Sequence, residues 1–506
     1  MALTLLACAA ILSCTLTYPF NNDNALYAYM AELALNGHLP YIGSWDQNFP
    51  AIVAVHAAQI LLSGHSQVAF RIFDILLQLI GSYFLIEIGT LLCDRRAGML
   101  AAILASLYYV QQGLWMAGER DTYVTLLLVA ALYVSLSGKR DFIVGMLCGV
   151  IFLFRPTYGL YAAVWSGLRL LGLETAHAEN DGFSVRAKEA LSLVAGATLP
   201  ALTLVIVYAL LGGVNQLWEA TMLFNLKIYS GTGAAFSLWE PVRFYAVSIV
   251  AVGFGIWYLI KQNRSALILW AGLFAASVLS LLLLYRHSVY HYHPAMTLFL
   301  LLSAVGWIRM EELLTTYWKG FRIAMPLLVG LFFLAQTFRG NTVQHVLLDI
   351  ARGRIQSLEE CYDRYEPSPE FGVRVQRQVG DYLAVHTKRG DTVQMFGPYS
   401  YPQYVAGLMT ASRFQTLHAI TMRSTATELQ PFQRVWRDEY LRDMQRNKPL
   451  YFIVCDAPEA FRQYYGGKLG HEILRDDFRE LGVWLAENYY PETKIGDFTL
   501  YHVRGR

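Results

Sequence analysis

Long apolar stretches separated by short polar loops fill the first two thirds of the chain. A membrane-spanning helix needs about 20 mostly apolar residues. This criterion predicts eleven spans, of which the pair that flanks Arg155-Pro156 is the shortest. The predicted spans lie near residues 2–18, 67–92, 97–114, 122–138, 141–154, 157–172, 190–211, 242–260, 265–285, 294–310 and 322–338. The pattern therefore predicts an α-helical, polytopic membrane protein with about 11 transmembrane helices.

The pattern changes after residue 338. Short runs of β-branched and aromatic residues at 391–396, 450–455 and 498–503 are typical of strands. Residues 369–388 and 428–447 have helical periodicity. We therefore predict two domains, a transmembrane domain over 1–338 and a soluble α/β domain over 339–506.

The distribution of charge supports this division. Charged residues make up 15% of the whole chain, but about 10% of residues 1–338 and about 26% of the rest, which is the soluble norm. This excludes a single soluble globule, a disordered chain and a nucleic-acid binder with a basic face. The net charge of +2 implies no bulk electrostatic partner.

Most Lys and Arg residues of the loops fall on one side of the predicted membrane, which the positive-inside rule makes cytoplasmic. The first span has no basic segment before it and no convincing cleavage site, so we predict a retained helix. With an odd number of spans, the C-terminal domain then lies in the periplasm or an equivalent extracytoplasmic space. The loops at 19–66, 115–121, 212–241 and 286–293 face the same side.

The first outer loop, residues 19–66, contains no Lys or Arg but carries Asp23 and Asp46 among many aromatic residues. Asn22-Asp23 opens a helical pattern that Gly37 closes, with apolar residues on one face. A second apolar segment near 51–62 is too short to span. Both segments are predicted to be helices that lie in the membrane interface.

The six cysteines are scattered and have no metal-ligand spacing. Cys361 and Cys455 both fall in the C-terminal domain, where they form a disulfide or stay as unpaired thiols. The sequence requires no cofactor, and we predict no metal site, although a divalent ion is not excluded.

Ionisable side chains at membrane depth are costly and are therefore functional candidates. The outer side gathers two kinds of group, acids and cations, which suit an anionic, amphipathic substrate such as a lipid phosphate. A sugar joined to a lipid phosphate leaves with an anion that cations stabilise, and its acceptor needs a general base. The candidates are Asp23, Asp46, Arg71, Glu119, Arg120, Asp121, Arg155, Lys227, Arg243, Arg286, His287, His291 and His293.

Several outer-side motifs resemble a known family. Residues 18–51 read YPFNNDNALYAYMAELALNGHLPYIGSWDQNFPA, and Gly118-Glu119-Arg120-Asp121, Phe154-Arg155-Pro156-Thr157 and His291-Tyr292 follow later. These motifs resemble the GT-C superfamily of glycosyltransferases that use lipid-phosphate sugars, in particular the bacterial relatives of protein O-mannosyltransferases and of the lipid A aminoarabinose transferase (family 39-like). The resemblance covers most of residues 1–338. It departs from the family at Asn24, where a second acid is usual, and at Asn48-Phe49-Pro50, which replaces Lys-Pro-Pro.

The resemblance implies an inverting glycosyltransferase of the bacterial inner membrane. Such an enzyme moves a hexosyl or pentosyl group from a polyprenyl-phosphate donor to an envelope glycan, lipid or protein. By position, Asp23 is similar to the catalytic base, and Asp121 matches the acid that positions donor or acceptor. The donor phosphate is expected to meet Arg120, Arg155 or Arg286. The other expected substrate contacts are Tyr27, Tyr41, Asp46 and His291.

Each of these residues also has a simpler interpretation. Asp23 and Asp121 can be acids of a helix start, and Arg120 and Arg286 can extend to lipid headgroups. His291 can line a polar site without binding metal. Tyr27 and Tyr41 can belong to an interfacial aromatic belt.

The alternative function is transport, by a flippase of polyprenyl-linked glycolipids or a secondary transporter. Intramembrane charges suit a transporter as well, but the sequence has no internal repeat, and a large outer domain is atypical of that class.

Overall fold

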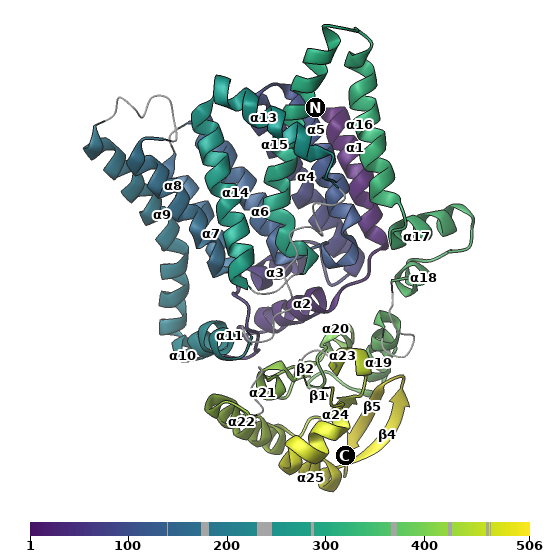
Figure 1. Cartoon of the computed structure of the whole chain (residues 1–506). Coiled ribbons are helices and arrows are strands. Elements are labelled where there is room, and N and C mark those ends of the chain that lie inside the picture. Colours follow the sequence, from purple (N-terminus) through teal and green to yellow (C-terminus); the bar gives the residue numbers. More distant parts are fainter. Residues whose placement is uncertain are drawn as a thin grey trace. The chain divides into compact units, whose positions relative to one another are not determined.

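A computed structural model gives the arrangement of the chain (Figure 1). The structure describes residues 1–138, 140–173, 182–229, 245–284, 288–365, 372–423, 428–461, 465 and 467–505. Arg243, Arg286 and His287, which the sequence singled out, lie outside the described residues.

The chain forms two compact units, each of which joins segments that are distant in sequence. The first unit contains Met1–Tyr18, Val68–Val207 and Ala234–Arg354. The second contains Pro19–Gln67, Tyr208–Gly233 and Ile355–Arg506. The first outer loop thus belongs to the same unit as the C-terminal domain. The division of the chain into domains at residue 338 stays a prediction.

The first unit is helical, and every one of the eleven ranges predicted to span the membrane contains a helix. Its helices are α1 (Ala2–Leu12), α4 (Gln67–Leu92), α5 (Arg95–Gln111), α6 (Arg120–Ser137), α7 (Asp141–Phe154), α8 (Leu160–Leu171), α9 (Phe183–Leu210), α13 (Ser248–Gln262), α14 (Arg264–Leu284), α15 (His293–Thr315), α16 (Phe321–Phe338) and α17 (Thr342–Ala351).

Within the described residues, five helices are each long and apolar enough to cross a membrane, namely α4, α6, α9, α14 and α16. The other predicted spans contain helices that are not by themselves both long enough and apolar enough to meet this criterion. The expectation of an α-helical, polytopic membrane protein is confirmed, whereas the count of eleven spans stays a prediction.

Helix α15 forms the centre of the first unit, where it packs against α5, α6 and α13 (Figure 1). Nearly all of its residues from His293 to Ile308 are buried, although the sequence gives it no dominant apolar face. Small residues permit the closest approach, because a Cβ atom on Gly306 would lie 1.7 Å from the carbonyl oxygen of Ala251 in α13. Such contacts between small residues are typical of helix packing in membranes.

The second unit contains the predicted α/β domain. Its sheet has the order β2-β1-β3-β5-β4, with β1, β2 and β3 parallel and β5 antiparallel to both of its neighbours. The strands are β1 (Thr392–Phe396), β2 (Met409–Thr410), β3 (Tyr451–Cys455), β4 (Tyr489–Ile495) and β5 (Phe498–Val503). The three strands predicted from the sequence are β1, β3 and β5, and the two edge strands were not anticipated.

The second unit also contains a set of mostly short helices. They are α10 (Val214–Trp218), α11 (Phe224–Lys227), α18 (Leu358–Asp363), α19 (Val373–His386), α20 (Tyr401–Ala406), α21 (His418–Thr421), α22 (Pro431–Asn447), α23 (Pro458–Phe461), α24 (Gly470–Glu472) and α25 (Arg479–Asn488). Helices α19 and α22 are the two helical segments that the sequence predicted. Cys361 and Cys455 are both free thiols and both buried, so they do not form a disulfide.

The first outer loop folds into the two predicted helices, α2 (Asn22–Leu35) and α3 (Ala51–Ser63). Asn21 caps α2, because its side chain accepts a hydrogen bond from the backbone N–H of Asn24 at 2.7 Å. Gly37, with a φ of +90°, follows the end of α2. Most residues of α2 are buried, and its placement in a membrane interface stays a prediction.

Candidate functional site

The first unit holds a buried group of polar side chains around Asp121. Asp121 lies in the first turn of α6 and is fully buried. Its carboxylate forms an ion pair with Arg155, with 3.1 Å between Oδ2 and Nη2. The hydroxyl of Tyr158 donates to the other carboxylate oxygen, Oδ1, at 2.7 Å. Asp121 therefore lies at the start of a helix and is also bound by side chains from other elements.

The backbone at Arg155-Pro156 explains how Arg155 reaches this position. Proline disfavours a helical conformation in the residue before it. Accordingly α7 ends at Phe154, and Arg155 is extended, with φ −160° and ψ 116°. A 3₁₀ turn, η3 (Pro156–Gly159), then starts with the proline and brings Tyr158 next to the same carboxylate. One interruption between two helices thus supplies two of the partners of Asp121.

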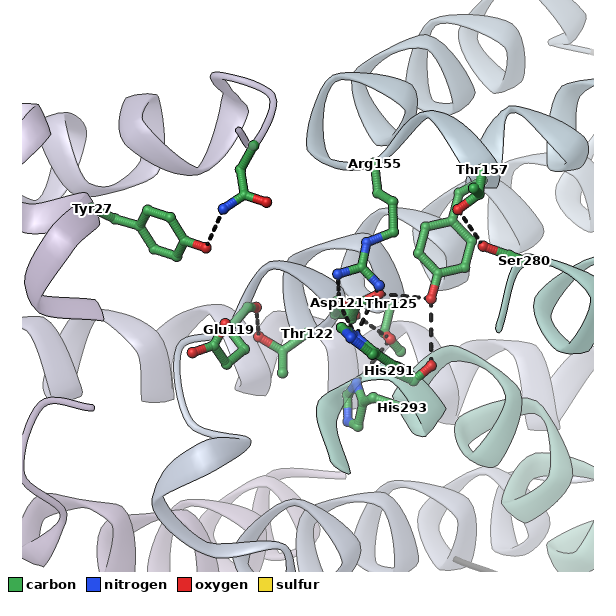
Figure 2. A network of polar contacts seen from close by, with 12 residues as sticks. Tyr27, Glu119, Asp121, Thr122, Thr125, Arg155, Thr157, Ser280, His291 and His293 are labelled. Atoms are coloured by element: carbon green, nitrogen blue, oxygen red, sulfur yellow. Dashed lines mark hydrogen bonds and ion pairs between the residues drawn. The ribbon is translucent and has the colours of Figure 1, made fainter. Parts of the chain in front are cut away.

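His291 is the third member of this group. It lies in a 3₁₀ turn, η8 (Val289–Tyr292), directly before α15. Its Nδ1 is 2.8 Å from Nη1 of Arg155 and 3.2 Å from Oδ2 of Asp121 (Figure 2). Nδ1 therefore faces a donor on Arg155 and an acceptor on Asp121. It accepts from Arg155 in the tautomer that carries the ring proton on Nε2, and it donates to Asp121 in the tautomer that carries the proton on Nδ1.

A second contact fixes the start of α15 to the start of α6. Thr125 donates its hydroxyl proton to the backbone carbonyl of Asp121 at 2.7 Å, and it accepts from Nδ1 of His293 at 2.8 Å. Thr157 in η3 and Ser280 in α14 share a hydrogen bond of 2.6 Å (Figure 2). The first contact thus ties the segment that carries His291 to the helix that carries Asp121, and the second ties the turn after Arg155 to α14.

Glu119 and Arg120 precede Asp121 and are also buried, with exposed fractions of 0% and 6%. Glu119 is the N-cap residue of α6, and its backbone carbonyl accepts from the Thr122 hydroxyl at 2.6 Å (Figure 2). Three charged residues, Glu119, Arg120 and Asp121, are therefore buried at the start of α6, and Arg155 from another segment pairs with one of them. Such a group is expensive in a membrane protein unless its members are paired and hydrogen-bonded.

The second unit brings together three of the other predicted site residues. Asn48 donates through its side-chain amide to the hydroxyl of Tyr27 at 3.1 Å and to Oδ2 of Asp46 at 2.9 Å. The hydroxyl of Tyr41 donates to the backbone carbonyl of Asn48 at 2.6 Å. Asn48 is thus the centre of this second group, at the position where the resembling family has a lysine.

Tyr41 has a left-handed backbone, with a φ of +68°. This conformation is rare for a non-glycine residue and marks a locally constrained segment. Asp23 lies half-buried in the first turn of α2, where Asn21 supplies the capping side chain. The capping role considered for Asp23 therefore belongs to Asn21. Lys227 is exposed at the end of α11.

Sequence reasoning missed Tyr158, Thr125 and Asn48. Tyr158 stands three residues after Arg155, and polar groups beside an interrupted helix are a signal that could have identified it. Thr125 is one helical turn after Asp121 on the same face. In the sequence, Asn48 stands out only because it replaces the lysine of a Lys-Pro-Pro motif. Among the described residues, no group of three or more His, Cys, Asp or Glu side chains is arranged to hold a metal ion.

No protein-family model matches the chain, and no curated protein matches its sequence. Several solved structures match its fold.

The structure is similar to that of ArnT, the lipid A aminoarabinose transferase of Cupriavidus metallidurans, bound to undecaprenyl phosphate. The TM-score is 0.58 at 12% identity, and the match covers 99% of this chain and 96% of that chain. The apo form of ArnT matches with a TM-score of 0.55 at 13% identity and the same coverage.

The archaeal oligosaccharyltransferase AglB of Archaeoglobus fulgidus, in complex with an inhibitory peptide and a dolichol-phosphate, matches with a TM-score of 0.54 at 12% identity. That match covers 99% of this chain and 74% of AglB. The chain therefore shares the fold of ArnT and AglB, and its apolar helices indicate a multi-pass membrane protein.

Proposed function

We propose that this chain is an inverting glycosyltransferase that transfers one sugar from a polyprenyl-phosphate donor to an acceptor of the cell envelope. We further propose that it acts in the bacterial inner membrane, with residues 339–506 in the periplasm. The observation that carries the proposal is the buried network of Asp121, Arg155, Tyr158 and His291, which gathers cationic and donor groups within a membrane bundle. Supporting it is the likeness of fold to proteins solved with undecaprenyl phosphate or dolichol-phosphate.

The cations have the role of stabilising the leaving phosphate. As the bond from the anomeric carbon to the phosphate oxygen breaks, its electron pair stays on the phosphate, and a preorganised cation stabilises that charge best where water is excluded. Arg155 fits this role because Asp121 and His291 hold its guanidinium in one orientation. Arg120 and Arg286 are proposed as further phosphate contacts, and His291 as a substrate contact.

Asp23 is proposed as the general base. The acceptor hydroxyl or amine would lose its proton to the carboxylate while its oxygen or nitrogen forms the new bond to the anomeric carbon, so one displacement inverts that centre. The first turn of α2 suits this role, since the helix N-terminus stabilises a carboxylate. Asp121 is proposed to act through Arg155, and Tyr27, Tyr41 and Asp46 are proposed to contact sugar or acceptor.

The test uses purified protein with radiolabelled polyprenyl-phosphate sugars and cell-envelope extracts. We expect covalent transfer of label by the wild type and a loss of at least about 10²-fold in Asp23→Asn, because one general base typically contributes that much. Asp381→Asn, which changes an exposed aspartate of α19, is the matched control and should transfer normally.

Two results would contradict the proposal in different ways. Unchanged transfer by a folded Asp23→Asn protein would remove Asp23 from the mechanism. Movement of glycolipid across reconstituted vesicles without any covalent transfer would favour the transporter or flippase instead.

A further inference from the structure

We propose that Arg71, Asp74 and Tyr109 are positioning residues that hold the turn at Ala117-Gly118, from which Glu119, Arg120 and Asp121 follow. This inference rests on the proposed function and deepens it, because it concerns how the site around Asp121 is held. Arg71 and Asp74 are one helical turn apart in α4, and Tyr109 is in α5. All three belong to the first unit.

Asp74 and Tyr109 form a chain of hydrogen bonds that ends at the turn. The hydroxyl of Tyr109 donates to Oδ2 of Asp74 at 2.6 Å and accepts from the backbone N–H of Gly118 at 2.9 Å. Gln78 donates to the other oxygen of Asp74 at 3.3 Å. Because the backbone N–H of Gly118 can only donate, the phenolic oxygen of Tyr109 accepts from it and directs its own proton to Asp74.

Arg71 holds the residue before Gly118. Its Nη1 donates to the backbone carbonyl of Ala117 at 2.8 Å, and its Nε donates to the carbonyl of Tyr18 at 3.4 Å. One peptide plane of the turn is therefore held from both sides, at its carbonyl by Arg71 and at its N–H by Tyr109.

Gly118 shows how closely this turn is pressed onto α4. Its φ is +73°, a conformation that favours glycine. A Cβ atom at this position would lie 2.6 Å from a ring carbon of Phe70, the neighbour of Arg71 in α4. The turn thus has no space to move toward α4, and it is held by one hydrogen bond from α4 and one from α5.

The burial of these side chains indicates a purpose beyond ordinary packing. Arg71 and Asp74 are both 0% exposed inside a helix that is long and apolar enough to cross the membrane. Ionisable residues in such helices are costly and usually serve a site. Here both serve a turn that ends three residues before Asp121. A misplacement of about 1 Å in a site can cost about 10²-fold in rate, so the hold on this turn sets the position of Arg120 and Asp121.

The central experiment compares Tyr109→Phe with Tyr108→Phe. Both tyrosines are fully buried neighbours in α5, but among the described residues only the Tyr109 hydroxyl bonds to the turn, and the Tyr108 hydroxyl has no hydrogen-bond partner. Hydrogen exchange of residues 116–122 and the transfer of sugar from a polyprenyl-phosphate donor are measured in detergent-purified full-length protein. Melting temperature reports folding, and Asp74→Asn serves as a second variant.

In Tyr109→Phe we expect exchange at the Gly118 amide to rise at least about 10-fold, with kcat lower by about 10- to 100-fold and KM within about threefold of the wild type. Asp74→Asn should change both quantities in the same direction, and Tyr108→Phe should change neither. A residue with a merely structural role would lower the melting temperature without this split between kcat and KM.

Unchanged hydrogen exchange at the turn in both Tyr109→Phe and Asp74→Asn would contradict the proposal that these residues hold the turn in place. Faster exchange with an unchanged kcat would overturn the positioning role. Absence of transfer by the wild type, with normal protection of the turn, would instead overturn the proposed function.

Discussion

Arg155 is the residue on which the buried network of the first unit depends. Its guanidinium contacts Asp121 through Nη2 and His291 through Nη1, so two separate N–H groups are used in fixed directions. Lysine, with a single charged nitrogen, cannot reproduce this geometry. A buried ion pair costs desolvation energy that only good geometry and further hydrogen bonds offset, and Tyr158 supplies one such bond.

Replacing Arg155 should therefore affect stability and transfer together. Arg155→Gln would leave the Asp121 carboxylate buried without its cation, which should cost about 3–5 kcal/mol of unfolding free energy. Arg155→Lys keeps the charge, so its melting temperature should lie between those of the wild type and Arg155→Gln. It should transfer sugar at least about 10-fold more slowly than the wild type. Melting curves in detergent and initial rates of sugar transfer measure the two effects. A wild-type melting temperature in Arg155→Gln would contradict the role of this pair.

A second residue-scale prediction concerns Asp456 in the C-terminal domain. His471 donates to Asp456 from its backbone N–H at 3.0 Å and lies within 2.5 Å of it through Nδ1. Burial raises the pKa of Asp456, but the hydrogen bonds from His471 outweigh it, so the pKa lies below its ordinary value of 3.8. A lowered carboxyl pKa gives stability above the unfolded pKa that is lost as the pH falls through the folded one.

Asp456→Asn should accordingly lower the melting temperature of the full chain at pH 6, by an amount equivalent to about 1–2 kcal/mol. The difference in melting temperature between Asp456→Asn and the wild type should become smaller as the pH falls below about 4. Thermal unfolding between pH 3 and pH 7 measures this, with exposed Asp381→Asn as the control. A gap that stays constant with pH would show that the carboxylate charge is not involved.

At the scale of elements, the helices of the first unit approach one another through small residues. Gly255 and Gly306 sit where α13 crosses α15, and a Cβ atom on either would lie 2.5 Å or less from a backbone oxygen of the other helix. Gly145 of α7 meets α9 in the same way, with 2.0 Å to the carbonyl oxygen of Leu193. Backbone contacts of this kind leave no flexible side chain that could adjust.

Gly306→Ala should therefore destabilise the bundle by about 1–3 kcal/mol through overpacking. The control is Gly253→Ala in α13, where a Cβ atom would meet nothing within 4 Å. This variant should be neutral or slightly stabilising, because alanine favours helix over glycine. Melting temperatures in one detergent compare the two. Equal effects would indicate that close crossing of α13 and α15 does not limit stability.

At the scale of the whole molecule, the second unit joins the first outer loop to the C-terminal domain. Gln415 accepts from the backbone N–H of Trp45 at 2.8 Å and donates to its carbonyl at 2.7 Å. Arg413 donates to the carbonyl of Tyr41 at 3.2 Å while it pairs with Glu439. The segment that carries Asp46 is thus held by residues about 370 positions later in the chain.

We expect Gln415→Leu to loosen this segment, because the change removes both hydrogen bonds and leaves the Trp45 backbone groups buried and unpaired. Limited proteolysis and hydrogen exchange of residues 41–48 should show faster cleavage and exchange. Gln445→Leu, at an exposed position of α22, is the matched control. Protection equal to the wild type in Gln415→Leu would show that the C-terminal domain does not hold the loop.

Much of the fold could be predicted from local patterns. Apolar runs located the helices of the first unit, and the Asn22–Gly37 pattern located α2, because spans and caps depend on neighbouring residues. The edge strand β4 was missed, since its residues alternate weakly and include Pro491 and Lys494. The two-residue strand β2 is too short to give a pattern of its own.

The candidate site could be predicted only as a set of side chains. Asp121, Arg155 and His291 were all expected, because charge and polarity at membrane depth are visible in a sequence. Their pairing was not, since Arg155 and His291 are 136 residues apart. Tyr158 and Asn48 were overlooked because tyrosine and asparagine gain a function only from what they contact.

The sequence by itself determined that the chain is a polytopic helical protein with an α/β domain, since hydrophobic burial and backbone propensity act over short stretches of chain. Only the tertiary structure decided which cation Asp121 holds, that His291 contacts both members of this pair, and that the first outer loop folds with the C-terminal domain. Hydrogen bonds and ion pairs act over a few ångströms, and folding alone brings distant residues within that reach.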